Sequence, residues 1–178
     1  MSTKSELAPF KLPRWEDLPD IDLYMDQVIK LTEKHLSSLG IKPVTAAMIN
    51  NYVKLKLLPA PIQKKYTRVH VAFIFAIAIL KDVFEITLIK EGILIETQTL
   101  GLKQAYNLFV SDVENAVRLI ETQGEKREPV TLLEGEITLE NRILKLAALT
   151  FAAQRVVKNL ILTESKGEKN DSKNSDLN

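Results

Sequence analysis

The sequence contains no cysteine and only two histidines, His35 and His70. The first absence excludes disulfides, thiol catalysis and cysteine-based zinc sites, and it is typical of a reducing compartment, so we expect a cytoplasmic protein. Neither histidine has a carboxylate at metal-ligand spacing, and His70 lies in an apolar stretch where a packed residue is expected. Glycine-rich phosphate loops and a nucleophile elbow are also lacking. We therefore expect no metal, no cofactor and no catalytic residue.

Long hydrophobic runs are lacking as well. The longest apolar segment extends from Val71 to Leu80, whereas a membrane-spanning helix needs about 20 apolar residues. This run therefore predicts a buried helix of the core and no membrane partner. The whole chain of 178 residues is 46% hydrophobic and 26% charged, as in ordinary globular proteins.

Acidic residues are missing from residues 34–81, although the formal net charge of the whole chain is only +1. A locally positive surface beside an acidic neighbour is typical of a protein that binds a phosphate backbone. A solvated basic face is the alternative interpretation. The basic residues of this stretch are Lys34, Lys42, Lys54, Lys56, Lys64, Lys65, Arg68 and Lys81.

Helical spacing of apolar residues and well-placed capping residues predict an all-α protein. Thr45 and Thr67 can cap two of the helices, while Pro59 and Pro61 interrupt the chain between them. Strands are expected only as pieces of two or three residues beside this proline turn. The predicted helices span residues 20–39 (or 22–39), 45–57, 67–83, 85–93, 101–122 and 138–162.

The chain divides into four predicted regions. A flexible N-terminal arm precedes a helix-turn-helix region, and a helical dimerisation or effector region is followed by a polar, disordered tail. The predicted bounds are 1–14, 15–95, 96–162 and 163–178.

The second predicted helix has two different faces. One half of its helical projection contains Ala46, Ile49, Tyr52 and Val53, and a second set of residues lies on the other half. That second set consists of Ala47, Asn50, Asn51 and Lys54. Asparagine pairs with adenine in the major groove, and lysine reaches guanine or phosphate.

A helix, a short turn and this second helix follow one another in helix-turn-helix order, with the second helix as the reading helix. The turn beyond it places two lysines where a wing would touch the DNA backbone. Asn50, Asn51 and Thr45 are the predicted base readers. The full set of predicted DNA-contacting residues is Thr45, Asn50, Asn51, Lys54, Lys56, Lys64, Lys65, Tyr66 and Arg68.

The same stretch resembles the DNA-binding domain of the MerR family of transcriptional regulators. Tyr52 with "LLP" at 57–59 matches the end of that family's recognition helix, and "KKY" at 64–66 matches the end of its wing. Residues 67–80 match its third helix, and Phe84, Ile86 and Ile89 match its fourth. The resemblance implies a winged-helix domain that binds double-stranded DNA and a regulator that acts as a dimer.

The chain departs from the MerR pattern at three places. Asn50 and Asn51 stand where an arginine is common, the wing is shorter, and Lys56 replaces the usual glycine at the helix exit. A lysine there must adopt a left-handed conformation at some cost or end the helix differently. Residues of about 15–160 also resemble an uncharacterised family of Bacillus-type bacteria, known only as a domain of unknown function, which implies no activity.

The last predicted helix is apolar on two faces, and both must be buried. One face carries Leu139, Ile143, Leu146, Thr150, Ala153, Val157 and Leu160, and the other carries Leu144, Ala148, Phe151 and Ile161. The helix at 101–122 can cover one face, and a second subunit can cover the other, which predicts a homodimer. The alternative is a protein-interaction module with weak or no DNA binding. A small-molecule or protein effector is compatible with this region, although no residue pattern names a ligand.

Overall fold

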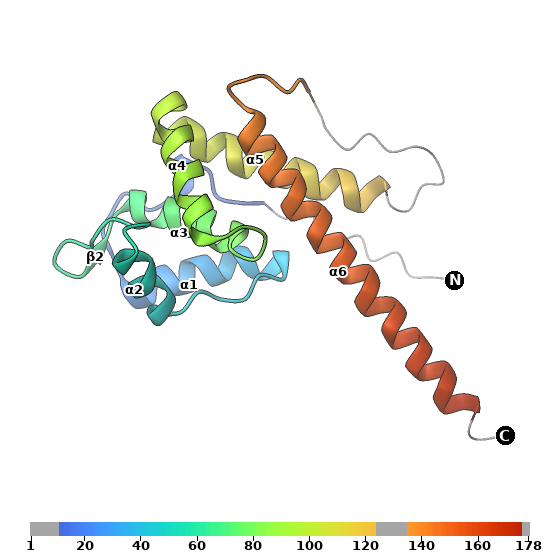
Figure 1. Cartoon of the computed structure of the whole chain (residues 1–178). Coiled ribbons are helices and arrows are strands. Elements are labelled where there is room, and N and C mark those ends of the chain that lie inside the picture. Colours follow the sequence, from blue (N-terminus) through green and yellow to red (C-terminus); the bar gives the residue numbers. More distant parts are fainter. Residues whose placement is uncertain (1–10, 124–134, 176–178) are drawn as a thin grey trace.

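A computed structural model describes the backbone of residues 11–123 and 135–175 and the side chains of residues 11–120 and 135–162. The protein is mostly helical, with one small antiparallel sheet of two strands, which confirms the all-α prediction (Figure 1). The α-helices are α1 (Met25–Leu36), α2 (Ala46–Lys54), α3 (Arg68–Leu80), α4 (Ile86–Leu100), α5 (Leu102–Gln123) and α6 (Arg142–Ser175). The strands are β1 (Leu23–Tyr24) and β2 (Lys65–Tyr66), and two 3₁₀ helices span Trp15–Asp17 and Ser37–Leu39.

Helix α3 is the centre of the core. It packs against α1, α4, α5, α6 and β2, and the side chains of Ile74, Phe75 and Ile77 are fully buried. A helix that is apolar all round is stable in water only when other elements cover every face. The apolar run from Val71 to Leu80 therefore forms the buried helix that its composition predicts.

Helix α2 begins as predicted but ends earlier. The Thr45 hydroxyl accepts a hydrogen bond from the backbone N–H of Met48 at 3.2 Å, which caps the helix. Lys56 then adopts a left-handed conformation with φ of 55°, so the helix stops at Lys54 instead of at residue 57. The backbone N–H groups of Leu57 and Leu58 turn back to the Tyr52 carbonyl, and both leucines enter the core.

Strand β1 was not predicted, and it shifts the start of the first helix. Leu23 pairs with Tyr66, and Tyr24 pairs with Lys65 in an antiparallel register. Because these residues are extended, α1 begins at Met25 and not at Asp20 or Asp22. The partner strand lies beside the proline turn, where a short strand was expected.

The N-terminal segment is attached to α5 from residue 11 onward. Leu12 is fully buried, and its backbone N–H donates to Glu114 Oε1 at 2.6 Å. The Tyr106 hydroxyl donates to the Pro13 carbonyl at 3.0 Å, and Arg14 forms an ion pair with Glu114 at 2.5 Å. Residues 12–14 of the predicted flexible arm are therefore packed against α5, and residues 1–10 lie outside the described part of the chain.

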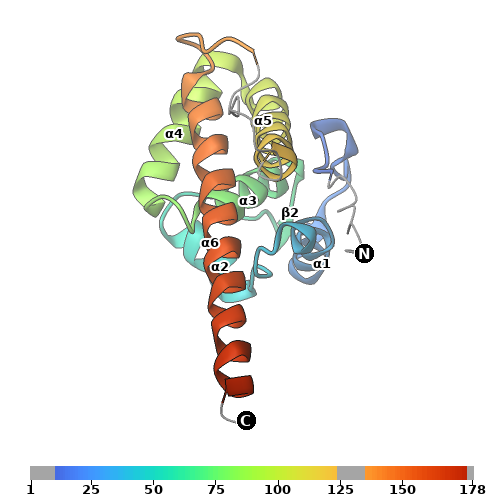
Figure 2. The ribbon, with the colours of Figure 1, turned by 90° about the vertical axis from the view of Figure 1, so that its right-hand side faces the viewer.

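The second half packs directly onto the first. The predicted boundary at residue 95 falls inside α4, and buried residues from Leu12 to Ala152 form one connected core. Helix α6 crosses α5 and then continues beyond the rest of the protein as a long rod (Figures 1 and 2). It begins at Arg142, later than expected, and its backbone remains helical to Ser175, where the composition predicts a disordered tail. Extending an existing helix is easier than starting one, because each added residue gains a hydrogen bond.

Two hydrogen bonds join α6 to the ends of helices in the first half. The Gln154 amide donates to the Asp82 carbonyl at 2.7 Å, and the Arg155 guanidinium donates to the Leu39 carbonyl. These bonds place α6 against the carboxyl ends of α1 and α3.

Candidate nucleic-acid interface

The outer face of α2 carries the polar residues that the helical projection predicts. Ala47, Asn50, Asn51 and Lys54 are exposed, while Ile49 on the opposite face is fully buried and Tyr52 is buried at 3% exposure. Ala46, which the projection places on the buried half, is exposed as well, because the first turn of α2 does not pack against the core. The helix thus presents two amides and one lysine, with a small residue between them, to the solvent.

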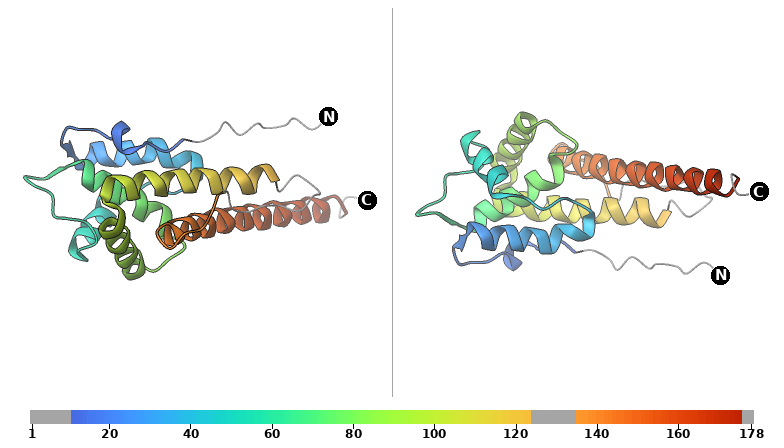
Figure 3. Two further views of the ribbon diagram at one scale, coloured as in Figure 1. Left: turned by 90° about the horizontal axis from the view of Figure 1, so that it is seen from above. Right: turned by 90° about the horizontal axis from the view of Figure 1, so that it is seen from below.

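A tight hairpin lies at the same end of the molecule as α2, far from the carboxyl terminus (Figures 1 and 3). The backbone N–H groups of Ile62 and Lys65 donate to each other's carbonyls at 3.2 and 2.9 Å. The two residues between them, Gln63 and Lys64, have φ of 49° and 64°. Two positive φ angles in a two-residue loop are the mark of a type I′ turn, which normally prefers Asn-Gly. Lys64 is thereby held at the exposed tip of the hairpin.

Strained backbone occurs in the segment that runs from the end of α2 to the hairpin tip, and the surface formed by α2 and this segment is called the basic surface below. Within the described residues, Lys56, Gln63 and Lys64 are the non-glycine residues with positive φ. For a side chain with a Cβ, the left-handed conformation costs about 1–2 kcal/mol. Strained residues of this kind gather at functional sites, so their position between α2 and the hairpin favours a functional role for this end of the protein.

The lysines of this surface are mostly unpaired. No carboxylate of the described chain lies within 4.0 Å of the ammonium groups of Lys54, Lys56 or Lys64. The Lys65 ammonium lies 5.6 Å from the centre of the Tyr24 ring, within the range of a cation–π contact. Unpaired lysines keep their charge available to an external anion.

Acidic side chains border the basic surface on the side of β1. Asp20, Asp22 and Asp26 are exposed and lie next to or near this strand, which pairs with β2. Exposed lysines on α2, at its exit and at the hairpin tip therefore lie beside an acidic border.

Two of the predicted contact residues are placed elsewhere. Tyr66 is only 3% exposed, its ring packs edge-on against His70 at 5.5 Å, and burial raises the pKa of its hydroxyl. Arg68 is half-buried, its Nε donates to the Pro19 carbonyl at 3.4 Å, and its guanidinium lies 5.9 Å from the Trp15 ring. Tyr66 is thus a core residue, and Arg68 holds the N-terminal segment. The position of Arg68 after the wing did not reveal its partners Pro19 and Trp15, which are distant in the sequence.

The other predicted contacts reach the surface. Thr45, Asn50, Asn51, Lys54, Lys56 and Lys64 are exposed, and Lys65 is half-buried. The Thr45 hydroxyl is already used as the cap of α2. Sequence reasoning missed Gln63, although its place in the two-residue loop between Ile62 and Lys65 could have indicated a tight turn.

His70 fixes the hairpin to the core. The backbone N–H of Thr67 donates to His70 Nδ1 at 3.0 Å, so the ring proton resides on Nε2, which donates to the Ala60 carbonyl at 3.4 Å. Burial lowers the pKa of His70 and keeps the ring neutral. The histidine is a packed residue, as its apolar neighbourhood predicts, and it joins the start of α3 to the segment that precedes the hairpin.

The comparison with protein families covers this same region. A family model described as a domain of unknown function (DUF1836) matches residues 13–109. The chain belongs to the DUF1836 family. The DUF1836 match includes α2, the hairpin, α3 and α4 but stops within α5 before α6. It is shorter than the span of about 15–160 that the resemblance suggested.

No curated protein and no solved structure was found to match the DUF1836 chain. Across the part of the chain that the structure describes, His, Asp and Glu nowhere gather in a group of three or more that could hold a metal ion. Among the same residues, every helix is too short or too polar to cross a membrane.

Proposed function

We propose that this DUF1836 protein is a sequence-specific DNA-binding transcriptional regulator of the winged helix-turn-helix type, with a fold related to the MerR domain. The observation that carries the proposal is the shared exposure of Asn50, Asn51 and Lys54 on α2, beside a strained hairpin with Lys64 at its tip. A helix fits the major groove, and asparagine and lysine are side chains that recognise base edges there.

The residues of the surface take different roles in this proposal. Asn50 and Asn51 read bases, because their amides are exposed near the centre of the outer face of α2. Lys54, Lys56 and Lys64 contact phosphates, because each is exposed without a carboxylate partner in the described chain. Phosphate contacts position a protein on DNA, and base contacts specify the sequence.

We further propose that the protein acts as a homodimer through α6. One face of α6 packs on α5 through Leu144, Ala148 and Phe151. Farther along α6, apolar side chains lie in solvent: Val157 is 54% exposed and Leu160 56%. A second copy of α6 would cover these side chains and place two α2 helices on a two-fold DNA site, about one helical turn of DNA apart or a multiple of it.

The decisive experiment is selection of short genomic DNA fragments by the purified protein at two salt concentrations. We expect an enriched inverted repeat that is still bound at the higher salt, because base contacts add to the salt-sensitive phosphate contacts. Enrichment of no fragment at either salt would contradict the proposal.

Variants separate the two roles of the surface. Lys54→Ala combined with Lys64→Ala should weaken binding to all sequences and lower the salt slope by about 0.9 for each phosphate that is no longer neutralised. Asn51→Ala should mainly reduce sequence preference. Arg142→Ala combined with Lys158→Ala removes the same charge from exposed sites on α6 and is the matched control. Equal weakening in the control and the lysine variant would refute a localised interface.

A protein-interaction module on the same scaffold is the second candidate. The exposed apolar residues of α4 and α6, such as Leu88 at 58% and Val157 at 54%, favour it. Failure to enrich DNA, together with a monomeric state in sedimentation, would make this candidate the better one.

A further inference from the structure

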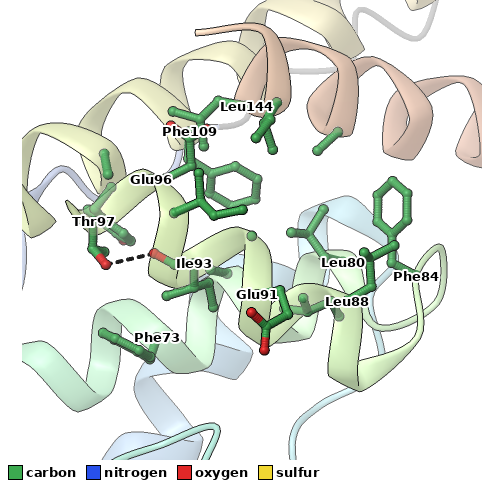
Figure 4. A pocket seen from close by; sticks show the side chains of 18 of the residues that line it. Phe73, Leu80, Phe84, Leu88, Glu91, Ile93, Glu96, Thr97, Phe109 and Leu144 are labelled. Carbon is green, nitrogen blue, oxygen red and sulfur yellow. Dashed lines mark hydrogen bonds between the residues drawn. The ribbon is translucent and has the colours of Figure 1, made fainter. Parts of the chain in front are cut away.

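A cavity of about 450 Å³ lies between α3, α4, α5 and α6. Its walls are almost entirely apolar, with Phe73, Leu80, Phe84, Ile93, Phe109 and Leu144 among the side chains that face it (Figure 4). Small-molecule sites in proteins are commonly cavities of about 300–1,000 Å³ with apolar walls and few polar groups. The size and the lining are therefore those of a ligand site.

One unpaired carboxyl group is part of this apolar wall. Glu96 is 5% exposed, and its Oε2 is buried without a hydrogen-bond partner in the described structure. A buried carboxyl without a partner is costly, and native proteins normally pair such groups. Burial also raises the pKa of Glu96, as expected for an acid that lacks a compensating charge.

The other polar groups of the wall are already engaged or exposed. The hydroxyls of Thr97 and Thr150 donate to the carbonyls of Ile93 and Leu146 in their own helices, both at 2.7 Å. The hydroxyl of Tyr106 donates to the Pro13 carbonyl. The remaining carboxyl group, Glu91, is exposed, and no basic residue is among the described residues that line the cavity. Within this described lining, Glu96 is thus the one buried group with an unpaired polar atom.

Gly92 keeps part of the cavity open. It lies in the middle of α4 and lines the cavity, and a Cβ added to it would meet no atom within 4 Å. Glycine inside a helix is unfavourable compared with alanine, and here it provides no close packing in return. Gly92 and Glu96 line the same cavity.

We propose that this cavity binds a small molecule with an apolar body and one protonated amine, and that the ammonium donates a hydrogen bond to the Glu96 carboxylate. The cation supplies the partner that the carboxylate lacks, and the apolar walls bury the rest of the molecule. An anionic ligand is disfavoured, because Glu91 and Glu96 are both acidic and no basic residue of the described lining offsets them. A wholly neutral apolar ligand would leave Glu96 unpaired.

The test measures binding by the full chain and requires no DNA. Isothermal titration calorimetry compares 4-phenylbutylamine with its neutral counterpart, 4-phenylbutanol. We expect the amine to bind at least about tenfold more tightly than the alcohol, because a charge-assisted hydrogen bond contributes more than a neutral one. Equal affinity of the two probes, or no binding of the amine, would overturn the proposal.

Two matched variants identify the carboxyl group. Glu96→Gln preserves the shape of the side chain and should weaken the amine at least about tenfold, with little effect on the alcohol. Glu33→Gln removes an exposed carboxylate from α1, outside the cavity lining, and should leave the binding of both probes unchanged. Amine binding that survives Glu96→Gln would refute the assignment. If that variant does not fold, the comparison of amine with alcohol on the unaltered protein still decides.

A third variant tests the cavity itself. Gly92→Phe places a ring in the open space and should abolish binding of both probes, while circular dichroism confirms that the chain is folded. If this variant retains the amine, the proposed location is wrong. If it instead dissociates a dimer of the unaltered protein, the occupant is a second copy of the chain and the proposal is overturned.

Discussion

The left-handed conformation of Lys56 leads to a prediction that tests how α2 ends. Its φ is 55°, its side chain is exposed, and no carboxylate of the described residues pairs with it. Lys56→Gly removes the strain on the Cβ, about 1–2 kcal/mol, but glycine offsets about 0.5–1 kcal/mol of this gain through the greater freedom of the unfolded chain. We therefore expect a net gain of about 0.5–1 kcal/mol in the free energy of unfolding, or about 1–4 °C in Tm.

Lys56→Ala is the matched control, because it removes the same charge and keeps a Cβ. Urea denaturation at one fixed protein concentration should show that only the glycine variant is stabilised. Both variants should lower the salt slope of DNA binding equally, by about 0.9, because each leaves one phosphate without its lysine. If the glycine variant were no more stable than the alanine variant, the left-handed exit from α2 would be refuted.

Three further predictions concern the core and the N-terminal segment. Phe75 is fully buried, so Phe75→Ala should cost about 3–5 kcal/mol of unfolding free energy, whereas Leu88→Ala at an exposed site should change it by less than about 0.5 kcal/mol. Glu114→Ala removes the hydrogen-bond acceptor of the Leu12 N–H and the ion-pair partner of Arg14. We expect the free energy of unfolding to fall by about 2 kcal/mol and proteolysis near residue 12 to become faster; an unchanged cleavage rate would contradict the attachment of this segment to α5. Burial lowers the pKa of His70 below its usual 6.5, so the unfolded chain binds more protons than the folded chain, and the free energy of unfolding should fall as the pH drops through about 6.5. His70→Gln should reduce this fall between about pH 7.5 and 5.5. An identical fall in the variant would contradict a buried neutral ring.

Many features of the fold could be predicted because they depend on neighbours in the sequence. The cap at Thr45, the break at Pro59 and Pro61, and the two-faced pattern of α6 each arise within one or two helical turns. The exposure of Asn50 and Asn51 also follows from helical geometry, since the buried positions of α2 leave only one face for them. The exposure of these residues could therefore be predicted from the sequence, whereas the strained turn at Gln63 was not predicted.

Other placements depend on partners that are distant in the sequence. Tyr66 and Arg68 follow the lysines of the hairpin and resembled surface residues, but Tyr66 pairs with Leu23 of β1 and the guanidinium of Arg68 lies over the Trp15 ring. Residues 11–14 resembled a loose arm, yet Glu114 and Tyr106 of α5 hold them. No local pattern contains this information.

By itself, the sequence determined the helical class, the buried α3, and the separation of apolar and basic faces, because these are set by the spacing of side chains along a helix. Tertiary structure alone decided that β1 pairs with β2, that α4 joins the two halves, and that Glu96 is buried without a partner for its Oε2 among the described residues. Glu96 has no unusual neighbours in the sequence. Its environment exists only because helices that are distant along the chain pack together around it, and no local pattern specifies that packing.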